Sequence, residues 1–167
     1  MWDKLEKEIA VEKELIDRLL EVHRSLCAKN LSEKPIAQAS KPPNNIEISA
    51  LAAMLHSFYT GIENLFKRIA IYVDNSPPRG EVWHSQLLKS MAEATQNRPA
   101  VISESLRIQL QSYLNFRHVF RHAYSFELRW SKMAPLVLEC ENTFRLLETQ
   151  LDNFLKEKVN DDTGKKD

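Results

Sequence analysis

Residues 46–73 read IEISALAAMLHSFYTGIENLFKRIAIYV and form the most apolar stretch of the chain. Within it, large apolar residues recur every three or four positions, which is the period of an α-helix with one buried face. These residues are Leu51, Leu55, Phe58, Ile62, Leu65, Phe66, Ile69 and Tyr72. The stretch therefore predicts a long helix that buries one face against the rest of the chain.

The same period predicts four further helices, separated by segments rich in Pro, Asn and Gly. They cover about residues 3–30, 81–95, 103–125 and 135–158. We expect a loop at 31–45 and a turn near 128–135, and no segment alternates as a strand does. The fold class is therefore all-α, with about five helices in one bundle over residues 1–158. A polar C-terminal tail follows at 159–167.

The composition is that of a soluble globular protein, with 43% hydrophobic and 28% charged residues among 167. Its 23 basic and 23 acidic residues cancel, which argues against nucleic-acid binding over the whole surface and leaves a local basic cleft open. No apolar stretch approaches the ~20 residues that span a bilayer, so no membrane contact is expected. Cys27 and Cys140 show no zinc spacing and no disulfide framework. We expect both to be reduced and buried, in a cytoplasmic protein.

Residues 116–124, FRHVFRHAY, concentrate ionisable groups within a predicted helix. Taking Arg117 as zero, an ideal helix places Arg121 near about 40°, His118 near about 100°, His122 near about 140° and Tyr124 near about −20°. The opposite side then carries Phe116, Val119, Phe120 and Ala123. We therefore expect this helix to pack through its apolar residues and to present a cationic, proton-exchanging strip outward or into an interface.

These residue types suit the cleavage of RNA. Histidine exchanges a proton near neutral pH, and the planar guanidinium of arginine suits phosphate oxygens. When the ribose 2′-OH is the nucleophile, a base and a positive charge suffice. The chain offers no carboxylate cluster for Mg²⁺, no His/Cys set for Zn²⁺ and no glycine-rich phosphate loop. We therefore expect neither a metal nor a cofactor.

One helix makes a poor complete site, because Arg117 and His122 diverge by about 140°. Two copies of the strip paired across a two-fold axis would supply two of each residue around one cleft, which predicts a homodimer with its active site at the interface. The surrounding segment 105–132 is basic: it holds Arg107, Arg117, Arg121, Arg129 and Lys132 against Glu127. The remaining histidines, His23, His56 and His84, are interpreted as structural or surface residues.

Residues 117–122 resemble the motif of the HEPN ribonucleases, in which Arg is followed by a polar residue, three variable residues and His. Ala123 and Tyr124 extend the motif to Arg-x4-His-x-Tyr, the form seen in HepT toxins. The segments at 59–70, 80–84 and 116–128 are similar to the HepT-like group as well. The resemblance covers about residues 5–157 and implies a HEPN-type helical bundle that dimerises through the motif helix.

The resemblance also implies a function. HepT-like proteins are metal-independent ribonuclease toxins that cleave transfer RNA or messenger RNA, and their partner is a minimal nucleotidyltransferase (MNT) antitoxin. That partner inactivates the toxin by transferring AMP to the motif tyrosine, as in a type VII toxin–antitoxin pair. Carried over to this chain, Arg117 and His122 would be catalytic, His118 and Arg121 would support the site, and Tyr124 would be AMPylated.

Two alternatives remain open at the level of the sequence. A HEPN module could bind nucleotides or RNA without cutting, and a helical adaptor could have a purely structural role. The second leaves the strip of arginines and histidines unexplained.

Overall fold

The computed structural model describes residues 1–30 and 42–163 of the chain. In order, the elements are α1 (Trp2–Asn30), α2 (Asn45–Tyr72), α3 (Trp83–Met91), α4 (Glu104–His122), the short 3₁₀ turn η2 (Ser125–Glu127) and α5 (Trp130–Thr163). Over these two ranges every regular element is helical, so the predicted all-α bundle of five helices is confirmed. None of these helices, within the described ranges, has the length and apolarity that crossing a membrane requires.

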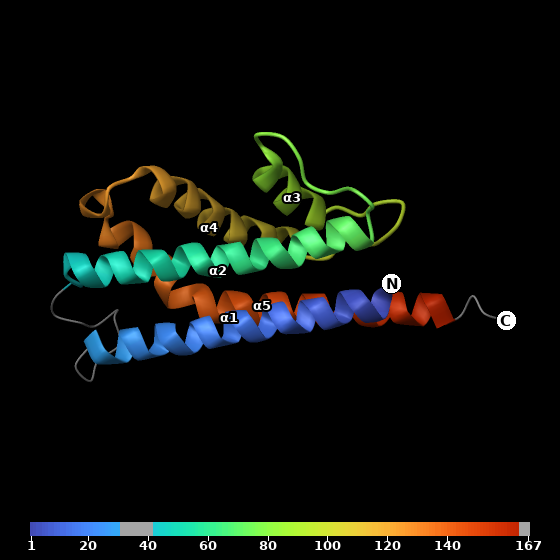
Figure 1. Ribbon diagram of the computed structural model, residues 1–167, viewed down its shortest axis with the longest axis horizontal. Coiled ribbons are helices and arrows are strands. Elements are labelled where there is room, and N and C mark those ends of the chain that lie inside the picture. The colour runs from blue at the N-terminus through green and yellow to red at the C-terminus, as the bar shows by residue number, and fades with distance from the viewer. Residues whose placement is uncertain (31–41, 164–167) are drawn as a thin grey trace.

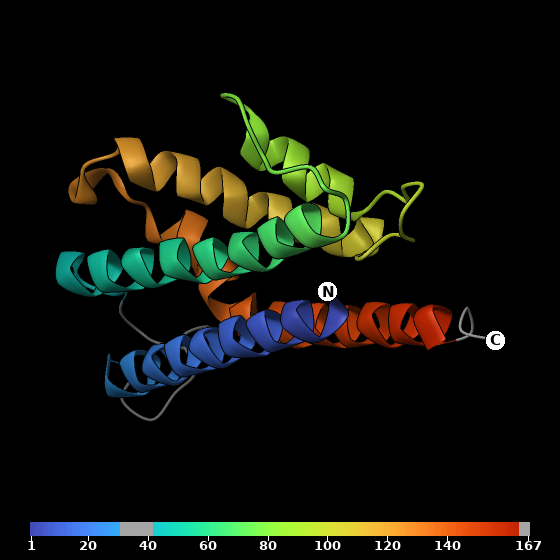
Figure 2. The ribbon, with the colours of Figure 1, turned by 45° about the vertical axis from the view of Figure 1, so that its right-hand side comes forward.

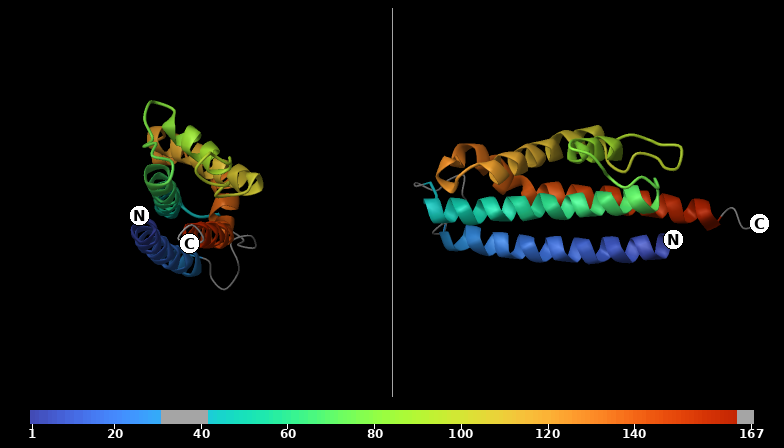
Figure 3. Two further views of the ribbon diagram at one scale, coloured as in Figure 1. Left: turned by 90° about the vertical axis from the view of Figure 1, so that its right-hand side faces the viewer. Right: turned by 45° about the horizontal axis from the view of Figure 1, so that its top comes forward.

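Helix α2 is the central element of the bundle, because it contacts each of the other α-helices. Figure 1 shows α1 and α5 on one side of α2, and α3 and α4 on the other. Figure 2 shows the same order from a second direction. Helix α1 runs antiparallel to α2 and α5, and it begins at the end of the molecule where α5 finishes (Figure 3). The residues that α2 places in the core are therefore within reach of both layers.

The start of α2 is fixed by a capping box. The Asn44 side chain accepts hydrogen bonds from the backbone N–H groups of Ile46 and Glu47, at 2.9 and 3.0 Å, and the Glu47 carboxylate accepts one from the Asn44 N–H at 2.7 Å. These bonds satisfy backbone donors that a helix leaves free at its first turn. The predicted apolar face is confirmed as core: Leu51, Leu55, Phe58, Ile62, Leu65, Phe66 and Ile69 are all buried.

Helix α4 begins where expected, because the Ser103 hydroxyl accepts a hydrogen bond from the Leu106 N–H at 3.3 Å. It ends at His122, earlier than the predicted boundary near residue 125. In a longer helix the Tyr124 N–H would bond to the Phe120 carbonyl, but here it donates to the Glu127 carboxylate at 2.7 Å. A side chain from the following turn thus ends the helix.

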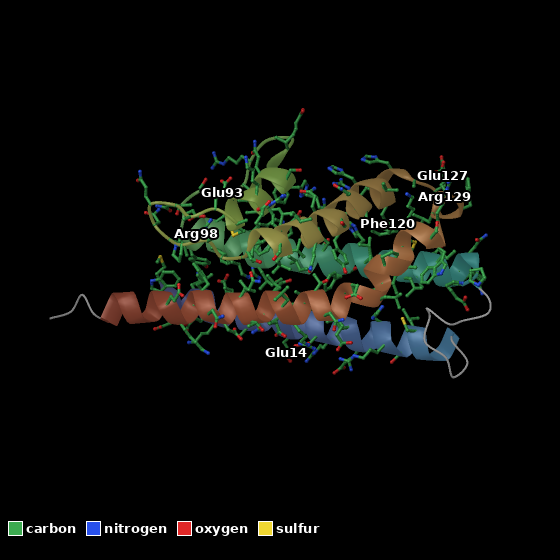
Figure 4. The ribbon with its side chains drawn as sticks, turned by 180° about the vertical axis from the view of Figure 1, so that it is seen from behind. Glu14, Glu93, Arg98, Phe120, Glu127 and Arg129 are labelled. Carbon is green, nitrogen blue, oxygen red and sulfur yellow. The ribbon has the colours of Figure 1, made fainter. Side chains whose placement is uncertain are left out.

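Three other predicted boundaries were wrong by several residues. Helix α3 covers nine residues rather than the fifteen of 81–95, and α5 begins at Trp130, within the segment predicted as a turn. Pro135 therefore lies inside α5, where its missing N–H and its ring disturb the helix, and the first turns of α5 run at an angle to the rest (Figure 4). Helix α5 also continues to Thr163, into the predicted tail. The loop expected at 31–45 falls mostly on residues 31–41, which lie outside the described ranges.

A buried arginine fixes the connection between α3 and α4. Arg98 is 2% exposed, and its Nε and Nη2 atoms each lie 2.8 Å from a carboxylate oxygen of Asp74, at the end of α2. It also donates to the carbonyl oxygens of Ser90, Glu93 and Pro99 at 3.1 to 3.2 Å. Figure 4 shows Arg98 and Glu93 together at this end of the molecule. A charged group can be buried here because every contact offers it an oxygen, and α3 is thereby tied to α2.

Both cysteines are free, as expected. Cys140 is fully buried, whereas Cys27 is only half-buried. His23 lies between them, with its Nε2 atom 3.4 Å from the Cys27 sulfur and 3.8 Å from that of Cys140. Burial raises the pKa of the Cys140 thiol to about 12, so this sulfur is a packing group of low reactivity.

We predict that Gly61→Ala destabilises the protein although alanine favours helices. A Cβ atom at position 61 would lie 2.7 Å from Cγ1 and 3.0 Å from Cδ1 of Ile16, a side chain that is 2% exposed. Since α1 and α2 must separate to admit it, we expect the free energy of unfolding, measured by urea denaturation, to fall by about 1–3 kcal/mol.

Ser57→Ala, at an exposed position one turn earlier in α2, is the matched control and should leave stability within about 0.5 kcal/mol of the original. Combining Gly61→Ala with Ile16→Ala should cost less than the sum of the two single changes, because the clash is then absent. Additive losses would contradict the proposed contact.

Candidate active site

Arg117 lies on the core side of α4, which corrects the predicted outward strip. Leu106, Leu110 and Tyr113 are 0 to 3% exposed, and Arg117 continues their spacing of four, three and four residues. Eleven residues return to within about 20° of the same face of a helix, so Arg117 points where Leu106 points, toward α2. Its side chain is only 12% exposed. The helix does pack through Phe116, as predicted, but Val119 is 57% exposed.

The Arg117 side chain meets a buried carboxylate on α2. Glu63 is 1% exposed, and its Oε1 atom lies 3.9 Å from Nη2 of Arg117. Its Oε2 atom accepts a hydrogen bond of 2.6 Å from Nδ1 of His84, on α3. Lys67, one turn further along α2, approaches Oε1 at 4.0 Å. One carboxylate therefore joins groups from three helices, and we refer to Glu63, His84 and Arg117 as the Glu63 cluster.

His84 is sandwiched between aromatic and cationic neighbours. Nη1 of Arg117 lies 3.3 Å from Nε2 and 3.4 Å from Nδ1 of the imidazole. Because it is nearly equidistant from both ring nitrogens, this group lies against the face of the ring rather than along one lone pair. The Trp83 ring stacks on His84 with centroids 3.6 Å apart, and the Lys67 ammonium lies 4.7 Å from the centroid of the Trp83 ring. The imidazole is thus held on its edge by Glu63 and on its face by Arg117.

Burial lowers the pKa of His84 below the ordinary value of 6.5. The hydrogen bond and the charge of Glu63 oppose that shift, whereas the positive charges of Arg117 and Lys67 reinforce it. His84 is therefore neutral at neutral pH, and it donates its one N–H to the Glu63 carboxylate. Burial and the Glu63 charge also raise the pKa of Tyr59, whose hydroxyl is buried without a hydrogen-bond partner.

The other motif residues lie on the outer side of α4 and past its end. His118, Arg121 and His122 are exposed, and no hydrogen bond joins any of them to Arg117. Tyr124 follows the last turn of the helix, so the predicted helical angle for it was wrong. Its ring is 71% exposed and stacks on Phe126, with centroids 5.4 Å apart and the planes 3° from parallel.

The end of α4 is where these exposed groups gather. Figure 4 shows Glu127 and Arg129 at this same end of the molecule, close to Phe120. Four side chains between residues 118 and 124 thus face solvent, namely His118, Arg121, His122 and Tyr124. The Arg117 guanidinium lies on the other side of the helix, toward α2 and α3. The structure thus buries the Arg117 cation of the motif and leaves its histidines, which can exchange protons, exposed.

Glu63 and His84 are the site residues that the sequence analysis missed. His84 was interpreted as a structural or surface residue, and Glu63 was given no role in the site. A signal for Glu63 was present, because it stands within the apolar spacing of α2, next to Ile62 and one turn after Tyr59. An ionised carboxylate on a buried face requires partners, and Arg and His are the side chains that supply them. No such pattern marked His84, because residues 63 and 84 are far apart in the sequence and no local spacing indicates that they are in contact.

Metal binding finds no support in the Glu63 cluster, which brings together one carboxylate, one imidazole and one guanidinium, with the Lys67 ammonium close by. Across residues 1–30 and 42–163, no three His, Cys, Asp or Glu side chains are grouped so that they could hold a metal ion. The chemistry available to the described side chains is proton exchange and the binding of anions.

One protein family matches this chain. The model of the family described as HepT-like protein matches residues 50–158, which extend from the first turns of α2 well into α5 and include the Glu63 cluster and Tyr124. No curated protein and no solved structure matches.

We predict that Glu63→Ala is strongly destabilising, because it leaves Arg117 facing His84 without a carboxylate between them. Removing one partner of a buried ion pair costs about 3–5 kcal/mol, and we expect a loss of this order in urea denaturation. Glu104→Ala is the matched control, since Glu104 also pairs with an arginine, at 2.7 Å, but has a side chain that is 64% exposed. Its loss should be much smaller, because solvent screens an exposed ion pair. Equal losses for the two variants would argue against a buried role for Glu63.

Proposed function

Since the chain belongs to the family of HepT-like proteins, we propose that it is a metal-independent endoribonuclease and the toxin of a type VII-like HepT/MNT pair. The observation that carries the proposal is the family's Arg-x4-His-x-Tyr motif, complete from Arg117 to Tyr124 within the matched segment. The proposed substrate is RNA, either transfer RNA or messenger RNA, and the proposed partner is a nucleotidyltransferase antitoxin.

In the proposed reaction, the His122 imidazole takes the proton of a ribose 2′-OH, and the 2′ oxygen attacks the adjacent phosphorus. The bond from phosphorus to the 5′ oxygen breaks, which leaves a 2′,3′-cyclic phosphate and a 5′-OH. Arg117 supplies the positive charge that stabilises the crowded phosphate, and a protonated imidazole returns a proton to the leaving oxygen. His118 and Arg121, both exposed beside His122, are proposed to support this site by contacting phosphate.

Two copies of the chain are proposed to form the complete site. The outer face of α4 carries His118 and His122 together with two exposed apolar residues, Ile108 and Val119, each 57% exposed. Eleven residues separate Ile108 from Val119, so they share one line along the helix. Pairing this face with its copy would cover both apolar side chains and bring two His122 side chains toward one axis.

Tyr124 is the proposed site of AMPylation. Its ring is 71% exposed, at the end of α4 and beside Arg121 and His122, so a transferring enzyme could reach the phenol. The phenol oxygen would attack the α-phosphorus of ATP, lose its proton and release pyrophosphate. The resulting phosphodiester anion would occupy the cationic surface that RNA phosphate needs, which gives the modification a direct inhibitory effect.

One observation favours a second candidate, a HEPN module that binds nucleotides or RNA without cutting. Arg117 is already engaged by Glu63 and His84, and it makes no hydrogen bond with His122. The cleavage test below separates the two candidates.

We predict that the purified protein cleaves RNA in the presence of EDTA and leaves 2′,3′-cyclic phosphate ends. Removing the proposed base or the proposed cation should slow cleavage by about 10²–10⁴-fold, so Arg117→Ala and His122→Ala should be nearly inactive. Cleavage is followed by gel electrophoresis of total RNA and by the chemistry of the new ends.

The matched control is Arg107→Ala, since Arg107 lies on the same helix but pairs with Glu104 at 2.7 Å, about four turns from His122. Cleavage that persists in both Arg117→Ala and His122→Ala would remove the assignment of these residues. Binding of RNA without any cleavage would favour the second candidate.

We also predict that a minimal nucleotidyltransferase encoded beside this chain, given ATP, adds AMP to Tyr124. Mass spectrometry of the intact protein should show one or more added AMP units, and fragmentation should place them on Tyr124. Tyr124→Phe should remain unmodified and should stay toxic in cells that express the partner. Modification of Tyr72, which is half-buried on α2, instead of Tyr124 would count against the assignment.

A further inference from the structure

Arg117 and His122, the two proposed catalytic residues, lie on the same helix but face opposite ways. His122 lies on the exposed side of α4, whereas the Arg117 side chain is 12% exposed and directed toward α2 and α3. A long arginine side chain has many rotamers, so its guanidinium keeps one position only where other groups hold it. The groups that hold Arg117 therefore decide where the positive charge of the site is placed.

The contacts of Arg117 identify these groups. Nη2 approaches Glu63 at 3.9 Å, a distance of charge attraction rather than of a hydrogen bond. Nη1 lies against the face of His84, at 3.3 and 3.4 Å from its two nitrogens. A guanidinium plane stacks well on a neutral ring but is repelled by a cationic one. The position of Arg117 therefore depends on the charge and the orientation of His84.

His84 is itself held by a short bond and by a stacked neighbour. Its Nδ1–H donates to Glu63 at 2.6 Å, which fixes both the ring plane and the tautomer. Trp83 packs on the ring with centroids 3.6 Å apart. The buried Glu63 thus fixes the position of the His84 ring, and the His84 ring fixes the position of the Arg117 guanidinium.

We infer that Glu63 and His84 are the positioning residues of the proposed ribonuclease, holding the Arg117 guanidinium where it meets the RNA phosphate in the transition state. This inference rests on the proposed function. Neither residue acts on RNA directly: Glu63 is 1% exposed, and its effect passes through His84 and Arg117. The family motif, which extends from Arg117 to Tyr124, contains neither of them.

The charges around His84 give the inference a pH dependence. From α2 it faces Glu63 and Lys67, and from α4 it faces Arg117. Protonating the ring would place a third cation in this group of one anion and two cations, and the ring would then repel the guanidinium stacked on it. Activity should therefore fall on the acid side as His84 gains its proton, in addition to any effect of His122.

Titration of the His84 ring by NMR tests the contact without using activity. Since Arg117 lowers the pKa of His84 and Glu63 raises it, Arg117→Ala should shift the midpoint upward and Glu63→Gln should shift it downward. Lys89→Gln, on the same helix with a side chain that is 72% exposed, is the matched control and should leave it unchanged. A midpoint that stays the same in Arg117→Ala would overturn the inference, whether or not the protein cuts RNA.

Kinetics test the positioning role. His84→Gln can still donate to Glu63 but offers no ring, so we expect kcat to fall about 100-fold while KM changes little. The acid limb of its pH profile should also move, which a purely structural role would not cause. If His84→Gln does not fold, as judged by circular dichroism, Glu63→Gln provides the same measurement.

The outcomes separate the inference from the function on which it rests. Wild-type kcat in a folded His84→Gln or Glu63→Gln variant, with Arg117→Ala inactive, would overturn the positioning role and leave the ribonuclease standing. If the unaltered protein does not cleave RNA, the proposed function falls, and the NMR midpoints still decide whether His84 holds Arg117.

Discussion

The buried carboxylate of Glu63 is the constraint that joins α3 and α4 to the central helix α2. Glu63 belongs to the central helix α2, and because water does not reach its carboxylate, positive or donating groups from neighbouring helices must contact it. It takes one from α3, His84, and one from α4, Arg117. The side of the bundle that carries the proposed site is thus assembled around a buried charge.

A second buried ion pair lies at the far end of α2. There Asp74 binds the buried Arg98, which also donates hydrogen bonds to three backbone carbonyls at the connection between α3 and α4. Since Arg98 fixes where α3 ends and Glu63 fixes where it begins, the short helix α3 has little freedom of its own. His84 is consequently held next to Arg117 by one ion pair and one hydrogen bond rather than by helix packing alone.

Separating Arg117 from His122 has a chemical consequence. A cation that is held inside by a carboxylate keeps a fixed place and stays ionised, while exposed histidines exchange protons freely with solvent. A nuclease that works through the 2′-OH needs both kinds of group. Both groups must reach the same phosphate, but in a single chain Arg117 and His122 point apart by about 140° on an ideal helix. Pairing two copies, as proposed above, would bring an arginine and a histidine to the same phosphate.

The sequence by itself determined the all-α class, the core face of α2 and the start of α4 at Ser103, because these depend on local spacing and on bonds between near neighbours. It also placed Arg117 and His122 on one helix. Only the tertiary structure decided that Arg117 lies on the core side of that helix together with Phe116, since the partner of Arg117 is a carboxylate 54 positions earlier. It likewise decided the position of His84 beside Glu63, because a contact between distant segments leaves no periodic pattern in the sequence.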